Sequence, residues 1–419
     1  MPAYPVFVTA PAGIAYAAGG SNIFQVISDS SLTGTMAPTS ANGSQTGYTA
    51  GTYSNLRVQV SANATAATAC TVTSNLGGSA GGQTVSITLG TTGEFTDAIG
   101  TDAFSSGVFG VIIKNADVSN TCTITAISML FNATTNTVKR IGCGTAAQAF
   151  STASSTVYYP PFGLLASNAT VGNVQAELYV TGTLKNLSVH LSANSRGTAC
   201  TLKSNIGGSA GNLSASITAN TTGEFHDTSS DSDSLANTGT IVCFQLTTGT
   251  AAGTVNLNTI SADVVTTDKT SVAGLAVSGG SSIGASSTKY FTFAGTSQGD
   301  TSTETFQKIE IGAACVVSRI TVNVTVNTAS GGASTVHIRT GASGGSQSNG
   351  TGAASITAST TGFFSDSSGT DTLTAATEVN YSIVTASGGT ITINSVACKL
   401  SQVPSAGGTN QLMLVGCGT

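Results

Sequence analysis

The stretch Thr222-Gly223-Glu224-Phe225-His226-Asp227 occurs three times, with small changes, in this 419-residue chain. The other two copies are Thr92-Gly93-Glu94-Phe95-Thr96-Asp97 and Thr361-Gly362-Phe363-Phe364-Ser365-Asp366. The period of roughly 130 to 140 residues is the size of a whole domain, far longer than one unit of a solenoid. The sequence therefore predicts a tandem array of three related domains.

Short apolar runs at a period of two surround each copy of the motif. The first strong run has Leu56, Val58 and Val60 on one face. The other copies repeat it as Leu187, Val189 and Leu191, and as Ile320, Val322 and Val324. Such alternation predicts strands with one buried face, and no segment shows a capped helical repeat. We expect an all-β chain of three tandem antiparallel β-sandwiches, jelly-roll-like, with almost no helix; an immunoglobulin-like sandwich is the alternative.

Thr- and Asn-rich stretches near residues 137 and 267 mark the expected domain boundaries. The predicted domains are residues 1–137, with a divergent N-terminal segment, 138–266 and 267–419. The last strand of each domain has apolar residues three positions apart, which predicts a shared β-bulge. These pairs are Ile124 and Ile127, Leu257 and Ile260, and Ile393 and Val396. In the repeated motif we expect the Gly to supply a bend, the Phe a core side chain, and the Asp a bond to its own loop backbone.

Charged residues make up only 7% of the chain, against about a quarter in an average soluble domain, and the net charge is −5. The basic residues are scattered, and Lys139-Arg140 is their only adjacent pair, which argues against nucleic acid as a partner. No stretch approaches the roughly 20 apolar residues of a membrane span, and the first residues lack the pattern of a secretory signal. We expect no nucleic-acid partner and no membrane partner.

The eight cysteines are expected to be reduced and buried, since the repeats align several of them with apolar residues. Cys122 aligns with Val255 and Ile391, Cys398 with Ala262 and Met129, and Cys70 and Cys200 with Val336. Cys143 and Cys417 each lie in a Gly-Cys-Gly-Thr sequence. A shared β-turn is favoured for this sequence over a pairing of the two thiols.

No catalytic constellation recurs among the three copies. The three histidines, His190, His226 and His337, align with other polar residues and lack a matching nucleophile and acid. We therefore expect no enzymatic activity and no cofactor. Asp227, Asp231 and Asp233 pack oxygen ligands closely and are candidate Ca²⁺ ligands, although a solvated loop is the favoured interpretation.

Aromatic residues near the starts of the first two domains are candidate docking residues for a partner. Tyr158, Tyr159 and Phe162 flank two prolines in a segment for which the other copies show no counterpart. The N-terminal candidates are equally well explained as core residues of the first strands. These N-terminal candidates are Tyr4, Phe7, Tyr16 and Phe24.

The pattern Thr-Thr-Gly-x-Phe-x-Asp after an alternating strand, followed by two further strands, resembles β-sandwich modules of accessory structural proteins of tailed bacteriophages. The residues that carry the resemblance are 85–97, 108–113 and 122–131, with their counterparts in the other copies. The resemblance implies a virion protein: a capsid decoration or cement protein, a head fibre, or a tail-associated adhesin. No coiled-coil or collagen-like shaft is present in the sequence, which favours capsid decoration.

The expected partners are accordingly the major capsid protein or other virion proteins, and the expected location is the virion surface after assembly in the host cytoplasm. A homo-oligomer, specifically a trimer, is expected from the local symmetry that virion accessory proteins obey. The first alternative is a tail fibre or a receptor- or carbohydrate-binding adhesin, against which the absence of Trp counts. The second alternative, an extracellular filament or cell-surface protein, would need an export route.

Overall fold

The computed structural model describes residues 3–16, 19, 22–25, 30–31, 45–47, 50–133, 137–266, 268, 270–296, 304, 307–311, 314–342, 345–374 and 377–402. These residues form an almost entirely β-stranded protein, with one 3₁₀ turn, η1, at Val171–Asn173. None of the described helical structure is long and apolar enough to cross a membrane. The prediction of an all-β chain with almost no helix is confirmed.

The strands form three groups in chain order. The first sandwich contains β1 (Ala3–Tyr16), β2 (Ile23–Gln25), β3 (Ser30–Ser31), β4 (Gln45–Gly47), β5 (Gly51–Asn63), β6 (Cys70–Leu76), β7 (Ser79–Ile87), β8 (Gly93–Phe104), β9 (Gly107–Asn115) and β10 (Cys122–Ala133). The second contains β11 (Thr137–Phe150), β12 (Thr156–Tyr159), β13 (Gly163–Leu164), β14 (Ala176–Leu178), β15 (Gly182–Asn194), β16 (Cys200–Ile206), β17 (Ser209–Ile217), β18 (Gly223–His226), β19 (Asp233–Leu235), β20 (Thr240–Thr247) and β21 (Val255–Thr266). The third contains β22 (Thr270–Ile283), β23 (Thr288–Phe291), β24 (Gly295–Thr296), β25 (Ile309–Glu310), β26 (Cys315–Asn327), β27 (Ser334–Ala342), β28 (Ser348–Ile356), β29 (Gly362–Ser365), β30 (Thr370–Leu373), β31 (Thr377–Val384) and β32 (Ile391–Gln402).

All three groups share one strand order in two facing sheets. In the second sandwich, one sheet runs β18-β15-β21-β11-β13 and the other β12-β20-β16-β17, with β14 also paired to β20. The first sandwich has β8-β5-β10-β1-β3 and β2-β9-β6-β7; the third has β29-β26-β32-β22-β24 and β23-β31-β27-β28. This exchange of successive strands between sheets is the double Greek key of a jelly roll, so the jelly-roll prediction is also confirmed.

The predicted apolar faces line the cores of the three sandwiches. Leu56, Val58 and Val60 on β5 are at most 1% exposed, and so are their counterparts on β15 and β26. Burying a side chain of this size stabilises the fold by about 1.5 to 3 kcal/mol relative to leaving it in water. The alternation at a period of two therefore identified the buried face of each of these strands.

The phase break of each last strand is a β-bulge, as predicted. Opposite β26, Ile393 pairs with Val324 and Ser395 pairs with Asn323, so Asn394 is the extra residue. The same shift leaves Thr125 extra in β10 and Asn258 extra in β21. The bulge turns a polar side chain out of the core in each sandwich, and in the third sandwich it aims Asn394 at the second.

Strand register corrects two details of the predicted repeat alignment. Cys70 and Cys200 pair with Ile87 and Ile217, whereas the corresponding residue of β27 is Ser334, which pairs with Ile356. The sequence alignment was therefore two residues out, because Thr, Val and Ile alternate in the same way at either offset. This shift also places His337 opposite Thr73 and Lys203 in the alignment of the three copies, two residues from its place in the sequence alignment.

The structure contradicts two further expectations from the sequence. Cys143 lies inside β11 and pairs with Ile260 and Gly163, so its Gly-Cys-Gly-Thr sequence is a strand and not a turn. Cys417 lies outside the described residues. The segment around Tyr159 does have a counterpart: Tyr159 pairs with Phe244 on β20 just as Phe291 pairs with Tyr381 on β31. The two prolines after Tyr159 hid this strand end in the sequence.

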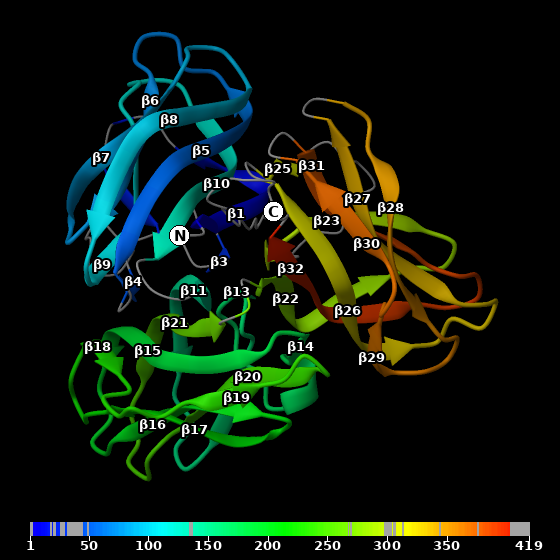
Figure 1. The fold of residues 1–419 in the computed structure, drawn as a ribbon. Helices are drawn as coiled ribbons and strands as arrows, with labels where there is room; N and C mark the ends of the chain where they lie inside the picture. The colour runs from blue at the N-terminus through cyan, green and yellow to red at the C-terminus, as the bar shows by residue number, and fades with distance from the viewer. Residues whose placement is uncertain are drawn as a thin grey trace.

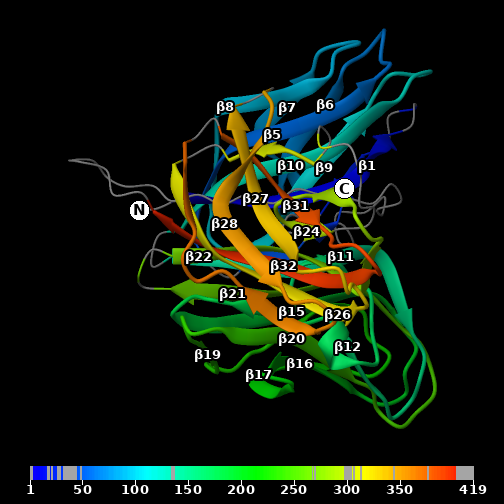
Figure 2. The same cartoon turned by 90° about the vertical axis from the view of Figure 1, so that its right-hand side faces the viewer.

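The three sandwiches surround a common centre, as Figures 1 and 2 show from two directions. The short strands β3, β13 and β24 meet there, and each of them contacts the other two. The contacts between sandwiches are cyclic: β3 lies against β11, β13 against β22, and β24 against β1. The chain therefore forms a closed ring of three jelly rolls about an approximate threefold axis.

Candidate functional site

The three candidate calcium ligands do not converge on one point. Asp227 accepts hydrogen bonds from the backbone N–H groups of Ser214 and Ser229, both at 2.9 Å. Asp233 is buried. It accepts one hydrogen bond from the backbone N–H of Asn212, at 2.7 Å, and another from the Ser204 hydroxyl. Asp231 is exposed. The carboxylates of Asp227 and Asp233 thus bind the backbone of β17 and fix the loop between them to that strand.

The same backbone contacts recur at the repeated motif of the other sandwiches. Asp97 accepts from the backbone of Thr84 at 2.8 Å, and Asp366 accepts from that of Ala353 at 2.8 Å. Burial acts to raise the pKa of both carboxyls, but backbone hydrogen bonds together hold it below its ordinary value; Gly100 donates the strongest of these to Asp97 and Gly369 the strongest to Asp366. No group of three or more His, Cys, Asp or Glu side chains in the described part of the chain could hold a metal ion. The motif is a structural corner of the fold.

The glycine of the motif is required for its backbone conformation. Gly93, Gly223 and Gly362 have φ angles of 110°, 100° and 119°, a region that L side chains rarely adopt. A Cβ added at any of them would meet nothing within 4 Å, so the constraint comes from the backbone and not from space. The positive φ explains why each copy has Gly here, and the bend or bulge expected from the sequence stays a prediction.

Two of the histidines lie on strands, away from any acid–base relay. His190 and His337 are partly buried, and the Nδ1 atom of each has no hydrogen-bond partner. Burial lowers the pKa of both; Glu224 opposes this at His190, and Arg339 adds to it at His337. Neither histidine is held by a carboxylate in the way that a catalytic base requires.

Several aromatic docking candidates belong to the protein core. Tyr16, Tyr159 and Phe162 are at most 1% exposed, so these rings pack inside the protein, and we remove them from the docking surface. Tyr158 is half-buried on β12. Tyr4 and Phe7 lie on β1, and Phe24 lies on β2 opposite Ile112, but their side chains are outside what the structure describes.

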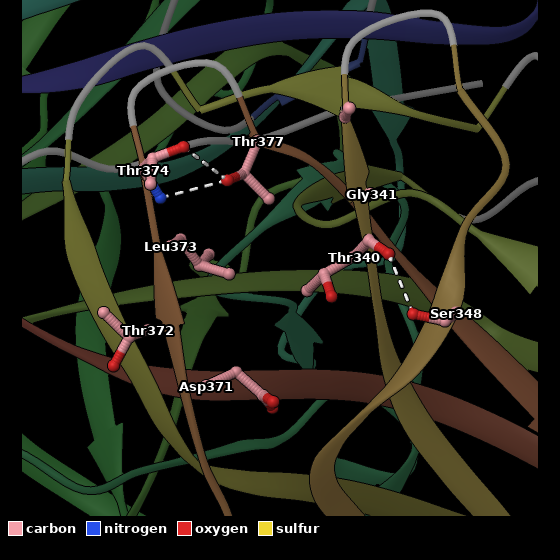
Figure 3. Close-up of a pocket in the computed structure, with 9 residues that line it drawn as sticks. Thr340, Gly341, Ser348, Asp371, Thr372, Leu373, Thr374 and Thr377 are labelled. Atoms are coloured by element: carbon pink, nitrogen blue, oxygen red, sulfur yellow. Dashed lines mark hydrogen bonds between the residues drawn. The ribbon is translucent and has the colours of Figure 1, made fainter.

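A pocket of about 470 Å³ opens in the third sandwich, where β30 faces β27 and β28 (Figure 3). Thr374 and Thr377 hydrogen-bond to each other at one end of it, and Ser348 bonds Thr340 across the strands. Its only charged lining residue, Asp371, is already bound to the backbone of Gly352 at 2.9 Å. No aromatic side chain lines the pocket, so it offers no ring on which a sugar could stack.

The centre of the ring is held by close backbone contacts. Gly163 on β13 has a φ of +81°, and a Cβ there would lie 2.8 Å from the carbonyl oxygen of Ala276 and would also strike that of Gly295. A Cβ at Gly274 would lie 2.6 Å from the ring of Phe162. Phe162 therefore docks the second sandwich onto the third, within the chain.

The buried part of the junction between the second and third sandwiches is made of neutral hydrogen bonds, while Lys399 donates to Asn237 at its exposed edge and Arg319 lies over the Tyr179 ring. Asn323 donates to the carbonyl oxygens of Gly172 and Gln175, at 2.9 and 3.1 Å. The bulge residue Asn394 donates to Asn173 at 2.8 Å, and the Ser395 hydroxyl donates to Gln175 at 2.8 Å. All three donors are at most 3% exposed, so this junction excludes water. The outer face of β26 and β32 thus receives η1 and the start of β14.

The junction between the first and third sandwiches combines apolar packing with an ionic contact. One nitrogen of Arg57, Nη1, lies 2.6 Å from Glu94 of its own sandwich and 2.6 Å from Glu310 of the third. The three side chains are 14 to 20% exposed. Burial raises the pKa of Glu94 to about 7, because the Arg57 guanidinium offsets only part of the cost and the Glu310 carboxylate adds to it. One cation thus serves two carboxylates.

The first and second sandwiches meet where Ser30 on β3 pairs with Gly163 on β13, which joins one sheet of each into a continuous sheet, and an ion pair of the second sandwich lies near this junction. Arg140 lies 2.8 Å from Asp263, whose other oxygen accepts from Asn186 at 2.7 Å. Burial raises the pKa of Tyr53 in the first sandwich, the nearby Arg140 opposes this, and Asp263 adds to it. Lys139 and Arg140, the one basic pair in the sequence, are both buried here and form no surface patch.

Sequence reasoning missed these junction residues because they alternate with core residues, as solvent-facing polar residues do. The one available clue was chemical: Arg57 and Arg140 are charged residues within otherwise apolar or hydroxyl-rich strands. A scan against models of protein families found no match to this chain, and a search of curated proteins found none either. Because no relative suggests a function, the proposal below rests on the ring of three jelly rolls.

Proposed function

We propose that this protein is a structural component of a tailed-phage virion, and specifically a decoration or cement protein on the outer surface of the capsid. The observation that carries the proposal is the ring of three jelly rolls about an approximate threefold axis. Jelly rolls are a recurrent architecture of viral shell proteins. The resemblance of the repeated Thr-Gly-x-Phe-x-Asp module to phage accessory proteins supports the same assignment.

A three-lobed ring suits a position where three shell subunits meet. The three lobes share one strand order and are arranged about an approximate threefold axis, so each can contact one of three shell subunits, and the three contacts can reinforce one another. The partner in this proposal is the major capsid protein, and the location is the virion surface. One chain already supplies the three lobes of a trimer, so a monomer can serve as the binding unit; the homotrimer expected from the sequence stays a prediction.

The test uses purified capsids that lack this protein. We expect the full chain to bind them, to bind isolated tails and host cells much less, and to saturate at a fixed ratio to the capsid protein. Reconstruction of the decorated shell should place each ring on a threefold or local threefold position. Binding to tails or to cells with no binding to shells would contradict the proposal and favour an adhesin.

A further inference from the structure

Two thiols face one another between the sheets of the first sandwich. Cys70 begins β6 in one sheet and Cys122 begins β10 in the other, and neither has exposed surface. Both side chains belong to the same buried cluster and interact with each other. This interaction lowers the pKa of Cys122, whereas the same interaction and burial raise the pKa of Cys70.

Backbone neighbours fix the approach of the two sheets at this end. Asn115 pairs with Cys70 across β9 and β6, and Tyr16 pairs with Cys122 across β1 and β10. The Nδ2 of Asn115 donates to the carbonyl oxygen of Tyr16 at 2.8 Å, which ties one sheet to the other beside the thiols. The proximity of Cys70 and Cys122 is therefore set by the fold and not by a chance choice of rotamer.

The other two sandwiches show that this end of the core does not need two thiols. By strand register, Cys200 and Val255 occupy the two positions in the second sandwich. Ser334 and Ile391 occupy them in the third. All four residues are buried as well. At this end of the core the first sandwich thus has two thiols, where the second has one and the third has none, so the other two sandwiches supply natural controls.

We propose that Cys70 and Cys122 form a disulfide that links the two sheets of the first sandwich when the folded chain meets hydrogen peroxide. The sulfur of Cys122 first attacks one peroxide oxygen: an S–O bond forms, the O–O bond breaks, and the released hydroxide takes up the thiol proton as water. The sulfur of Cys70 then attacks that of Cys122: the S–S bond forms, the S–O bond breaks, and hydroxide leaves with the Cys70 proton as a second water. Two thiols and one peroxide become one disulfide and two waters.

Such a bond would form only after the chain leaves a reducing compartment, since cytosolic thiols are kept reduced. It would close the chain between residues 70 and 122 and join the sheets covalently. A loop of this length is expected to stabilise the first sandwich considerably, mainly by restricting its unfolded state. The inference does not depend on the proposed function, because it concerns the folded chain alone.

The test treats the full native chain with hydrogen peroxide, alkylates the remaining thiols, and maps peptides by mass spectrometry. We expect a loss of two of the eight thiols, a peptide that links Cys70 to Cys122, and full reversal by dithiothreitol. The thermal midpoint of the first sandwich should rise by roughly 10 °C on oxidation. Recovery of both cysteines in alkylated form, as sulfinic acids, or joined to other cysteines would overturn the proposal.

Natural residues of the other sandwiches supply the variants. Cys122→Val copies the second sandwich and Cys70→Ser copies the third, so both are compatible with this fold. Each should abolish the linked peptide and the rise in the thermal midpoint. The matched control Cys200→Val should retain both. If Cys122→Val still lost two thiols on oxidation, or Cys200→Val abolished the bond, the assignment to Cys70 and Cys122 would be wrong.

Discussion

Two junctions of the ring occupy corresponding places on the jelly roll yet use different chemistry. The third sandwich receives the second through Asn323, Asn394 and Ser395, which are neutral donors to backbone carbonyls. The first receives the third through Arg57, with Glu94 and Glu310 on either side. By strand register, Thr321 takes the place of Arg57 at the neutral junction. The same scaffold thus holds one junction that is insensitive to pH and one that titrates.

The difference matters because the two junctions have different covalent constraints. The second and third sandwiches follow one another in the chain, so their junction forms between neighbours. The first and third sandwiches are joined only through the second, and their contact closes the ring. Apolar contacts and the strands β1, β3 and β24 also hold this junction, and the ionic contact is the part of it that pH and salt can weaken.

The largest expected effect is at the neutral junction. Asn394→Ala removes both the donor to Asn173 and the acceptor of the Thr325 hydroxyl, so we expect the loss of two hydrogen bonds to lower the free energy of unfolding by about 2 to 3 kcal/mol. Urea denaturation of the full chain measures this loss. The matched control is Thr125→Ala at the same bulge of the first sandwich, where the side chain bonds Gln59 of its own sandwich. The control should cost about 1 kcal/mol, and equal losses would show that Asn394 does not act across the junction.

The second effect is at the ionic junction. Arg57→Met leaves Glu94 and Glu310 facing each other without their cation, which we expect to cost about 2 kcal/mol at pH 8. Hydrogen exchange should report faster exchange at the contact between β5 and β25, with the contact of β26 and η1 unchanged. The loss should shrink at pH 5, where Glu94 is protonated. A loss that is equal at both pH values would contradict the shared-cation account.

The third expected effect is that of pH, which should change the stability of the junction at Glu94 and leave the junction at Asn394 unchanged. The pKa of Glu94 is raised to about 7 in the folded chain from an ordinary value of 4.5. The stability gained by keeping it protonated is therefore fully present below about pH 4.5 and is lost as the pH rises through about 7. We expect the ring-closing contact to weaken by about 1 to 2 kcal/mol between pH 5 and pH 8. Glu94→Gln should abolish this pH dependence, and a wild-type profile that rises with pH would contradict the assignment.

The smallest effect is that of salt. Raising the sodium chloride concentration from about 0.05 to about 1 M shortens the Debye length about 4.5-fold and should weaken the ionic contact by less than about 1 kcal/mol. The neutral junction should not change in the same experiment. Hydrogen exchange at β25 and at η1 provides both readings from one sample. Equal responses at the two places would remove the distinction between the junctions.

The jelly rolls were predictable from the sequence, whereas the ring was not. Alternation of Leu56, Val58 and Val60 identified a buried face, and the three-residue step before Ile127 identified the bulge. The ring depends on polar side chains such as Asn323 and Ser395, which alternate with core residues as solvent-exposed ones do. Their partners are backbone carbonyls about 150 to 220 residues away, for which a single sequence carries no signal.

The aromatic docking candidates show the same limit of prediction from a single sequence. Phe162 was predicted to dock a partner, and it does contact another domain, but that domain is the third sandwich of its own chain. Prolines 160 and 161 interrupted the strand pattern and made a core segment look like a divergent loop. The corner carboxylates were interpreted correctly, because the third copy replaces Glu with Phe363 and keeps Asp366.

Small-angle X-ray scattering of the monomeric full chain tests the closed ring most directly. Three jelly rolls packed about one centre form a single compact body, for which we expect a radius of gyration of about 22 Å. Three sandwiches strung end to end would give a value above roughly 30 Å. A value near the first figure at pH 6 supports the ring, and a value near the second at the same pH would contradict it.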